Sequence, residues 1–230
     1  MSQQSSNKTI AKNTIMLYFR MLLTMGVGLF TSRVILQTLG VTDYGIYQSV
    51  GGIVGFIGFL NNALATGSSR FLTFELGKGN LDKLKSTFST TLTIHIALAI
   101  IIVILAETVG LWFLYNKLII PTERFDAAVY CFHFSVLAAA FSITQAPYSA
   151  SIMSHEKMDL YAYVSIVETV LKLGIVYMLY IGNFDKLKMY ATLFFCLTVG
   201  LQIFYRVYCV KHFPETKYKF VYEKNILEDI

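Results

Sequence analysis

Long runs of apolar residues constrain this chain more than any other feature of its sequence. Hydrophobic residues fill 55% of the 230 positions and charged residues only 14%, whereas soluble domains average about 25% charged residues. A helix needs roughly 20 apolar residues to cross the hydrocarbon core of a bilayer. The runs therefore predict an all-α, polytopic membrane protein with a six-helix transmembrane bundle over residues 13–210. The expected spans are residues 13–39, 44–66, 87–114, 125–152, 160–181 and 187–210.

The distribution of basic residues predicts how this bundle is oriented. Most of the 19 Lys and Arg residues fall on the side of the membrane that holds both termini. Basic residues favour the cytoplasmic loops of multi-pass proteins, so residues 1–12 and the basic tail 211–230 are expected in the cytoplasm. The same bias accounts for the net charge of +5, and nucleic acid is not an expected partner.

The sequence contains none of the patterns that are typical of catalytic or cofactor-binding sites. It has no paired-histidine metal motif, no Gly-x-Ser-x-Gly and no phosphate-binding glycine loop. The three cysteines, Cys131, Cys196 and Cys209, lie far apart and show no metal or disulfide spacing. We therefore expect neither an enzyme nor a protein with a cofactor.

Charges inside a bilayer are costly and mark candidate functional sites. Arg20 and Arg33 both fall within the first span. Each either extends to the nearer interface or faces a hydrated cavity that attracts an anionic group. Thirteen residues at about 100° each place the two side chains about 140° apart on the helix, so they are not expected to face one cavity equally.

Glu168 and Lys172 lie near the middle of the fifth span, out of reach of either interface. Their i, i+4 spacing with Glu first allows an ion pair within the helix. Together with Tyr161 and Ser165 they form one polar stripe, which is expected to face the bundle interior or water. The stripe is either a self-neutralised structural pair or a cavity site that meets substrate or a coupling ion.

Polar residues on the fourth and sixth spans suggest a shared aqueous cleft, although hydrogen bonds between helices would explain them equally well. These residues are Asp126, His133, Ser142, Gln145, Ser149, Thr192, Thr198, Gln202 and Tyr205. The second span carries small residues at intervals that permit close helix packing or helix sliding. These are Gly51, Gly55 and Gly58 on one face and Gly45, Ser49 and Gly52 on the next.

The run SRVILQTLGVTDYGIYQ at residues 32–48 resembles the junction between the first and second helices of Wzx-type (O-antigen) polysaccharide flippases. These flippases belong to the multidrug/oligosaccharidyl-lipid/polysaccharide exporter superfamily. The most specific piece is Leu39-Gly40 followed by Asp43-Tyr44-Gly45. SSRFLTFELGKGN at residues 68–80 and APYSASIMSHEKMDLYAYVSIVETVLKL at residues 146–173 support the resemblance, which covers about residues 8–213.

The resemblance implies a flippase of the bacterial cytoplasmic (inner) membrane. Its partner would be undecaprenyl-diphosphate-linked oligosaccharide, moved to the outer leaflet for lipopolysaccharide or surface polysaccharide synthesis. Family members carry basic residues in a central cavity that suit a lipid diphosphate. The candidates here are Arg20, Arg33 and Lys172, with Arg70 at the cytoplasmic mouth.

Members of this family have twelve or more spans in two bundles, whereas six are expected here. The chain is therefore expected to be equivalent to the N-terminal half, whether as a fragment, a truncated product or a half that dimerises. Its further partner would be a second six-helix bundle. The alternative function is a cation-coupled multidrug exporter of the same superfamily, for which Glu168 would matter most. A membrane enzyme acting on polyprenyl lipids and a non-transporting scaffold are less favoured.

Overall fold

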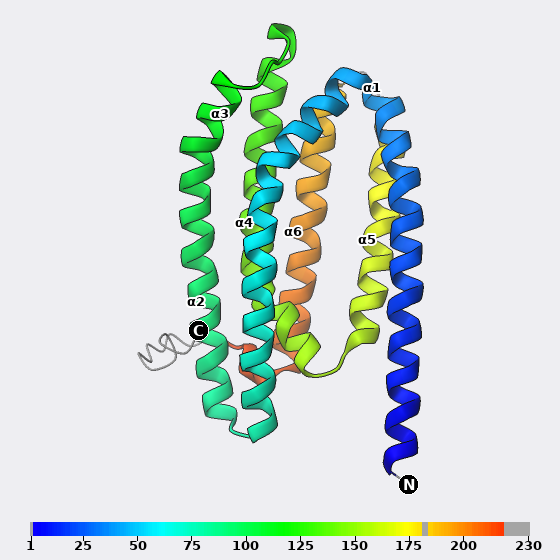
Figure 1. Ribbon diagram of the computed structural model, residues 1–230, viewed down its shortest axis with the longest axis vertical. Helices are drawn as coiled ribbons and strands as arrows, with labels where there is room; N and C mark the ends of the chain where they lie inside the picture. The colour runs from blue at the N-terminus through cyan, green and yellow to red at the C-terminus, as the bar shows by residue number, and fades with distance from the viewer. Residues whose placement is uncertain (1, 181–183, 219–230) are drawn as a thin grey trace.

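Figure 1 shows the computed structural model, a bundle of long helices that run side by side. The structure describes the backbone of residues 2–180 and 184–218, and the side chains of 14–55, 65–157, 159–160, 162–180 and 184–218. No strand occurs in these parts of the chain. The helical elements are α1 (Ser2–Lys78), α2 (Leu81–Leu105), η1 (Ala106–Gly110), α3 (Leu111–Asn116), η2 (Thr122–Arg124), α4 (Phe125–Ser154), α5 (Met158–Met178), α6 (Lys186–His212) and η3 (Pro214–Thr216).

α1 consists of two helices that meet at Gly40 and run in opposite directions (Figure 1). We call residues 2–39 the first arm and residues 41–78 the second arm. Gly40 has φ 81° and ψ 169°, a backbone conformation that is essentially restricted to glycine. The loop expected between residues 39 and 44 is therefore a single residue, because helix resumes at Val41.

Four helical stretches are long and apolar enough to cross a membrane, by length and composition, among the described residues. They are Thr14–Gly55, Leu81–Asn116, Thr122–Ser154 and Lys186–His212. The first of these includes parts of both arms of α1. The chain is thus an all-α, polytopic membrane protein, and the count of six spans remains a prediction.

The turn between α1 and α2 follows the local signals in the sequence. Gly79 has φ 72° just after the last helical residue, Lys78. Asn80 caps α2, because its side-chain Oδ1 accepts a hydrogen bond from the Lys83 backbone N–H at 3.1 Å. Asp82 in the first turn adds a favourable charge at the positive end of the helix. We call this end of the bundle the Gly79 end and the opposite one the Gly40 end.

α2 continues through the π-helical turn η1 into α3, so the three elements form one rod. Gly110 closes the π turn and lies directly against the ring of Phe132 on α4. A Cβ at this position would lie only 2.8 Å from Cζ of Phe132. Gly110 therefore allows the rod to approach α4 closely.

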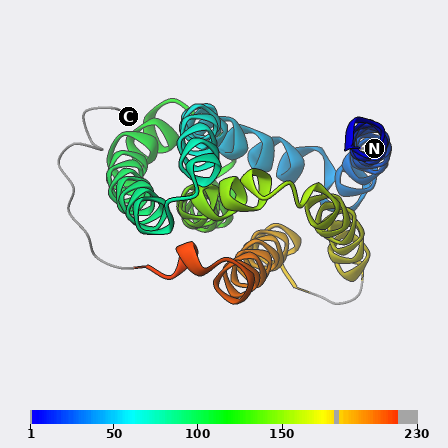
Figure 2. The same ribbon diagram turned by 90° about the horizontal axis from the view of Figure 1, so that it is seen from below.

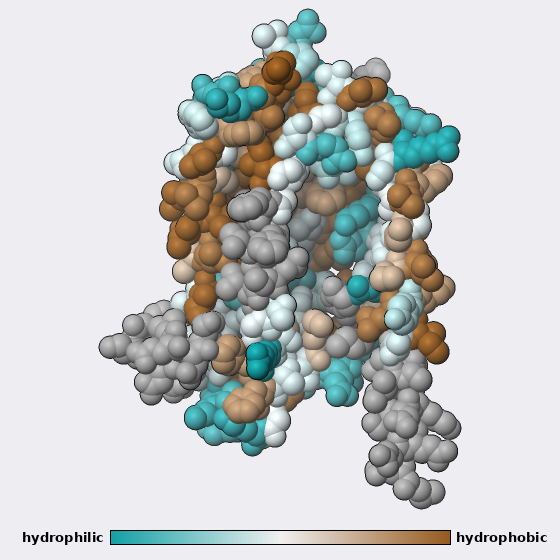
Figure 3. Space-filling view, in the orientation of Figure 1, coloured by the Kyte–Doolittle hydropathy of each residue, from teal (hydrophilic) through white to brown (hydrophobic). Residues whose placement is uncertain are grey.

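α4 lies in the middle of the bundle and packs against α2, α6 and the second arm of α1 (Figure 2). α5 and the first arm of α1 pack against one another to one side of α4. Buried apolar residues form one cluster toward the Gly40 end, around Val50 and Phe132, and another toward the Gly79 end, around Phe88 and Ile152. Figure 3 shows hydrophobic side chains along the flanks and hydrophilic ones at the ends and in a hollow beside the first arm.

A charged cluster, which we call the Arg124 clasp, joins three elements at the Gly40 end. The Arg124 guanidinium donates to both carboxylate oxygens of Asp43 at 2.8 and 2.6 Å, and to both of Asp185 at 2.8 and 3.0 Å. Asp43 lies just after the Gly40 turn, and Asp185 caps α6 by accepting from the backbone N–H groups of Leu187 and Lys188. The clasp therefore fixes the α1 turn against the start of α4 and the start of α6.

The Arg124 clasp also shifts the pKa of the Asp185 carboxyl. Partial burial raises this pKa, but the hydrogen bonds from Arg124 and from the two capping N–H groups outweigh burial and hold it below its ordinary value. The carboxylate form is thus the one that the folded protein stabilises.

The chain after α6 turns back under the bundle at the Gly79 end. Phe213, Glu215 and Thr216 are buried there. The buried Glu215 Oε1 lies 2.6 Å from Nε2 of His155, whose ring stacks on Phe213 at 4.2 Å between centroids. This contact ties η3 to the turn that follows α4.

Candidate functional site

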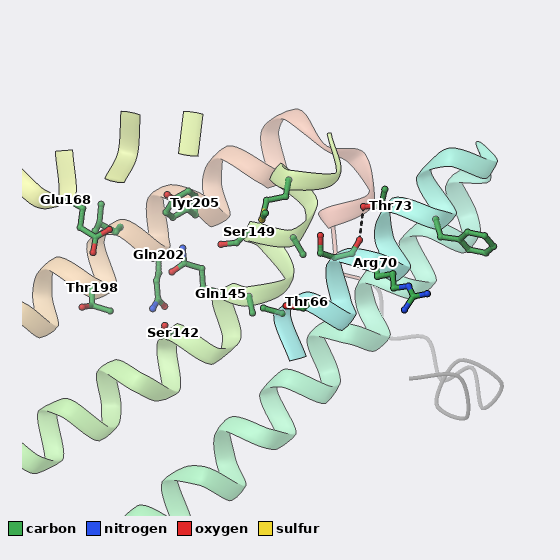
Figure 4. Close-up of a pocket in the computed structure, with 17 residues that line it drawn as sticks. Thr66, Arg70, Thr73, Ser142, Gln145, Ser149, Glu168, Thr198, Gln202 and Tyr205 are labelled. Atoms are coloured by element: carbon green, nitrogen blue, oxygen red, sulfur yellow. Dashed lines mark hydrogen bonds between the residues drawn. The ribbon is translucent and has the colours of Figure 1, made fainter. Parts of the chain in front are cut away.

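A cavity of about 1120 Å³, which we call the main cavity, lies between the second arm of α1, α4, α5 and α6. Eleven of its 17 lining residues are polar, and nine of these are uncharged (Figure 4). The polar lining residues are Thr66, Ser69, Arg70, Thr73, Ser142, Gln145, Ser149, Glu168, Thr198, Gln202 and Tyr205. Six of these belong to the polar sets predicted on the fourth and sixth spans, so the expectation of a shared cleft is confirmed for them.

The remaining members of those polar sets lie elsewhere. Asp126 is exposed at the start of α4. His133 Nδ1 lies 2.9 Å from Oε1 of Glu107 on the π turn, and Thr192 shares a 2.9 Å hydrogen bond with Tyr130. These three residues therefore do not line the main cavity.

Glu168 lies where the main cavity meets two smaller cavities. One has a volume of about 400 Å³ and is bounded by the first arm of α1, α5 and residues 44–48; we call it the side cavity. The other has a volume of about 390 Å³ and lies between the second arm, α4 and α6. Glu168 lines all three. A change in the charge or the ion-pair partner of Glu168 would therefore alter the electrostatic potential in all three cavities.

The predicted ion pair within α5 is confirmed. Lys172 Nζ lies 2.7 Å from Oε1 of Glu168, and both side chains are more than a third exposed. Lys172 Nζ also lies 5.4 Å from the centroid of the Phe194 ring. Ser165, Glu168 and Lys172 line the side cavity together, while the fourth member of the predicted stripe, Tyr161, falls outside the described side chains.

The structure separates the other candidate residues. Arg70 lines the main cavity toward the Gly79 end, and Figure 4 places it at the opposite side of the group from Glu168. Arg20 is on the same helix face as Thr24 and Thr31, which line the side cavity, but Arg20 lines none of the four cavities described here. Arg33 lines a different cavity of about 770 Å³ beside Tyr177 and Tyr180.

The glycine-bearing faces of the second arm are open within the described part of the structure. A Cβ added at Gly45, Gly51, Gly52 or Gly55 would meet no other atom within 4 Å. Gly51 and Gly55 instead line the smaller cavity beside Glu168. Close helix packing at these four positions, one of the two predicted roles, is therefore not observed among the described residues, and Gly58 lies outside the described side chains.

The Arg124 clasp was not predicted from the sequence. Its partners lie 81 and 61 residues from Arg124, so no local pattern connects them. The local signals for its two carboxylates were Asp43, close to the glycine turn, and Asp185, at the position before α6. No group of three or more His, Cys, Asp or Glu side chains among the described residues could hold a metal ion.

A polar, partly charged cavity between apolar helices is typical of membrane transporters. In the comparison with protein families, MatE matches residues 17–178, more than half of the chain. The chain therefore belongs to the MatE family, a transporter family of the multidrug/oligosaccharidyl-lipid/polysaccharide exporter superfamily. The match runs from the first arm of α1 to the end of α5 and includes all five candidate residues. The comparisons with curated proteins and with solved structures found no match.

Proposed function

We propose that this chain forms one half of a flippase for undecaprenyl-diphosphate-linked oligosaccharides in the bacterial cytoplasmic membrane. The observation that carries the proposal is the composition of the main cavity. Among the described residues, Arg70 is the one cation that lines it, toward the Gly79 end, and hydroxyl and amide groups interspersed with apolar side chains extend from there to Glu168. The resemblance of residues 32–48 to polysaccharide flippases also favours a flippase, and membership of the MatE family is compatible with this function.

Each part of such a ligand has a chemical counterpart here. The diphosphate is an anion, for which an arginine offers a fork of N–H donors. The glycan is neutral and rich in hydroxyl groups, which match the Ser, Thr and Gln side chains of the wall. The prenyl chain would stay against the apolar flanks, where Leu22, Leu29 and Val170 are exposed.

We propose that the Gly79 end faces the cytoplasm, so that both termini lie there. The basic residues of the 67–86 and 211–230 segments favour this orientation. Arg70 would then receive the diphosphate at the leaflet where the lipid-linked glycan is made. A second six-helix bundle, supplied by a continuing chain or by another copy, would cover the first arm of α1.

Glu168 supports a second candidate, a cation-coupled exporter of drugs or other small molecules. Its carboxylate lines three cavities at mid-helix, a placement that suits a binding group for a coupling ion or a cationic substrate. Lys172 neutralises this carboxylate at 2.7 Å, and a cation would have to compete with it. We therefore favour the flippase.

Complementation of a flippase-deficient strain with the full-length gene product tests the proposal. We expect Arg70→Ala to reduce surface polysaccharide about tenfold or more, because loss of a hydrogen bond to a charged group costs about 1.5–3 kcal/mol. Lys172→Ala should reduce it as well, because it leaves the Glu168 carboxylate in the main cavity as an unpaired negative charge that repels the diphosphate. Arg33→Ala should have a smaller effect, since Arg33 lines a separate cavity.

Protein levels in the membrane fraction serve as the control for these variants. Normal polysaccharide in both the Arg70 and the Lys172 variants would contradict the flippase proposal. Ethidium efflux by the wild type that Glu168→Gln abolishes would favour the exporter instead.

A further inference from the structure

The side chain of Gln202 has an unusual position in the wall of the main cavity. Gln202 is only 2% exposed, and it projects from α6 among Ser142, Gln145 and Thr198 (Figure 4). Both its Oε1 and its Nε2 atom are buried without a hydrogen-bond partner among the described residues. Neither atom is exposed to the cavity in this structure, so an occupant can pair with them only after the Gln202 side chain turns toward it.

A buried amide without partners is costly to the fold. Each unsatisfied buried donor or acceptor costs about 1–3 kcal/mol, and buried polar groups in native proteins are nearly always satisfied. An apolar residue of similar size would avoid this cost in a wall made by α4 and α6. A partner from outside the described side chains, such as an occupant of the cavity, would remove this cost.

The surroundings of Gln202 restrict the chemistry of the occupant. Arg70 and Glu168 are the only charged residues that line the main cavity in the described part of the chain, and they lie at opposite sides of the group in Figure 4. Between them the wall consists of hydroxyl and amide groups, with apolar side chains such as Ala146 and Leu201. A neutral ligand that both donates and accepts hydrogen bonds fits this part of the cavity.

We propose that Gln202 is the centre of a sugar subsite and binds two neighbouring hydroxyl groups of one sugar ring. One hydroxyl donates to Oε1 and the next accepts from Nε2, because the two atoms of an amide present an acceptor and a donor side by side. Ser142, Gln145 and Thr198 surround the same ring. This inference rests on the proposed function, which it deepens by separating a neutral sugar subsite from the anion subsite at Arg70.

The test uses the full-length protein in nanodiscs and saturation-transfer NMR with four probes. The probes are the methyl glycosides of glucose, galactose, mannose and N-acetylglucosamine. We expect the wild type to bind at least one of them, and Gln202→Met to weaken that binding about tenfold, equivalent to about 1.4 kcal/mol. Gln202→Glu keeps the shape and the acceptors but loses the donor, and should show an intermediate loss. Gln37→Met, in the cavity beside Arg33, is the matched control and should bind like the wild type.

Thermal unfolding of the same variants separates ligand binding from a structural role. Gln202→Met removes the unsatisfied amide, so the ligand-free variant should unfold at the same temperature as the wild type or a few degrees higher. Weaker sugar binding together with unchanged or higher stability supports the subsite. Lower stability of the Met and Glu variants with unchanged glycoside binding would overturn it, and so would a wild type that binds none of the four probes.

Binding of farnesyl diphosphate tests the proposed function separately. Binding by the wild type that Arg70→Ala removes and Gln202→Met leaves unchanged supports two distinct subsites. Absence of farnesyl diphosphate binding counts against the flippase proposal alone, because the glycoside signals still decide whether the sugar subsite exists. Equal loss of farnesyl diphosphate binding in both variants would overturn the separation of the subsites.

Discussion

At the scale of single residues, Gly40 sets the relative direction of the first two helices. It reverses the direction of two long helices within one residue, and its φ of 81° with ψ of 169° is accessible to glycine and strained for other residues. Leu39-Gly40 and Asp43-Tyr44-Gly45 are also the most specific piece of the sequence resemblance. The structure gives a physical reason for that motif, because Gly40 makes the reversal and Asp43 binds Arg124.

Gly40→Ala should lower stability by about 1–3 kcal/mol, the usual cost of holding a side chain in such a backbone region. For a chain of this size we expect a fall of several degrees in the unfolding temperature, measured by scanning fluorimetry in detergent. Gly45→Ala is the matched control, since it lies in regular helix with open space around its Cα, and it should be neutral or slightly stabilising. Equal effects of the two substitutions would contradict this account.

At the scale of elements, the Arg124 clasp holds together three helix ends. The guanidinium binds two carboxylates with four short hydrogen bonds. Charge-assisted bonds with this fork geometry are among the strongest in proteins. Lys186 adds to the arrangement by donating to the backbone carbonyl of Thr38 at 3.2 Å, at the end of the first arm.

Acid should weaken the Arg124 clasp. The pKa of Asp185 in the folded protein lies below its ordinary value of 3.8, so the folded state binds this proton less tightly than the unfolded state does. The stabilisation is therefore complete above about pH 4 and is lost as the pH falls through the lowered pKa. We expect the unfolding temperature of the wild type to fall as the pH is lowered from about 4 to about 2, and that of Asp185→Asn to start lower and fall less.

Arg124→Met should destabilise the fold by about 1–3 kcal/mol, because it leaves two partly buried carboxylates without their partner. Lys83→Met, at an exposed position at the other end of the bundle, is the control and should change little. A parallel pH profile for the wild type and Asp185→Asn would show that the clasp does not depend on this carboxylate.

The features predictable from the sequence were those with local causes. The Glu168–Lys172 pair follows from i, i+4 spacing, and the Asn80 cap follows from its position after Gly79. The polar residues of α4 and α6 could be assigned to a shared cleft because each helix has a regular period. The angle of about 140° between Arg20 and Arg33 likewise predicted that they would not face one cavity equally. The clasp and the one-residue turn depend on how distant helices pack and on the backbone dihedrals of one glycine, which no local pattern specifies.

At the scale of the whole molecule, the two ends of the bundle differ in ways that a labelling experiment can detect. Ile119, in the connection between α3 and η2 at the Gly40 end, is fully exposed. Lys157 is exposed at the Gly79 end. We predict that the Gly40 end is the extracytoplasmic one, in keeping with the basic segments at the other end.

The test starts from a variant in which Cys131, Cys196 and Cys209 are replaced, and adds one new cysteine. A membrane-impermeant maleimide should label Ile119→Cys in intact cells and Lys157→Cys only after permeabilisation. Labelling of Lys157→Cys in intact cells, with Ile119→Cys protected, would reverse the proposed orientation and place Arg70 at the outer leaflet.

The one-residue reversal at Gly40 also limits how this protein can be engineered. Epitope tags, protease sites and fused fiducial domains for electron microscopy all need a connection that tolerates inserted residues. The Gly40 turn offers none, because helix begins again at Val41 and Asp43 is already held by Arg124. At that end of the bundle, residues 117–121 provide the non-helical connection where such an insertion belongs.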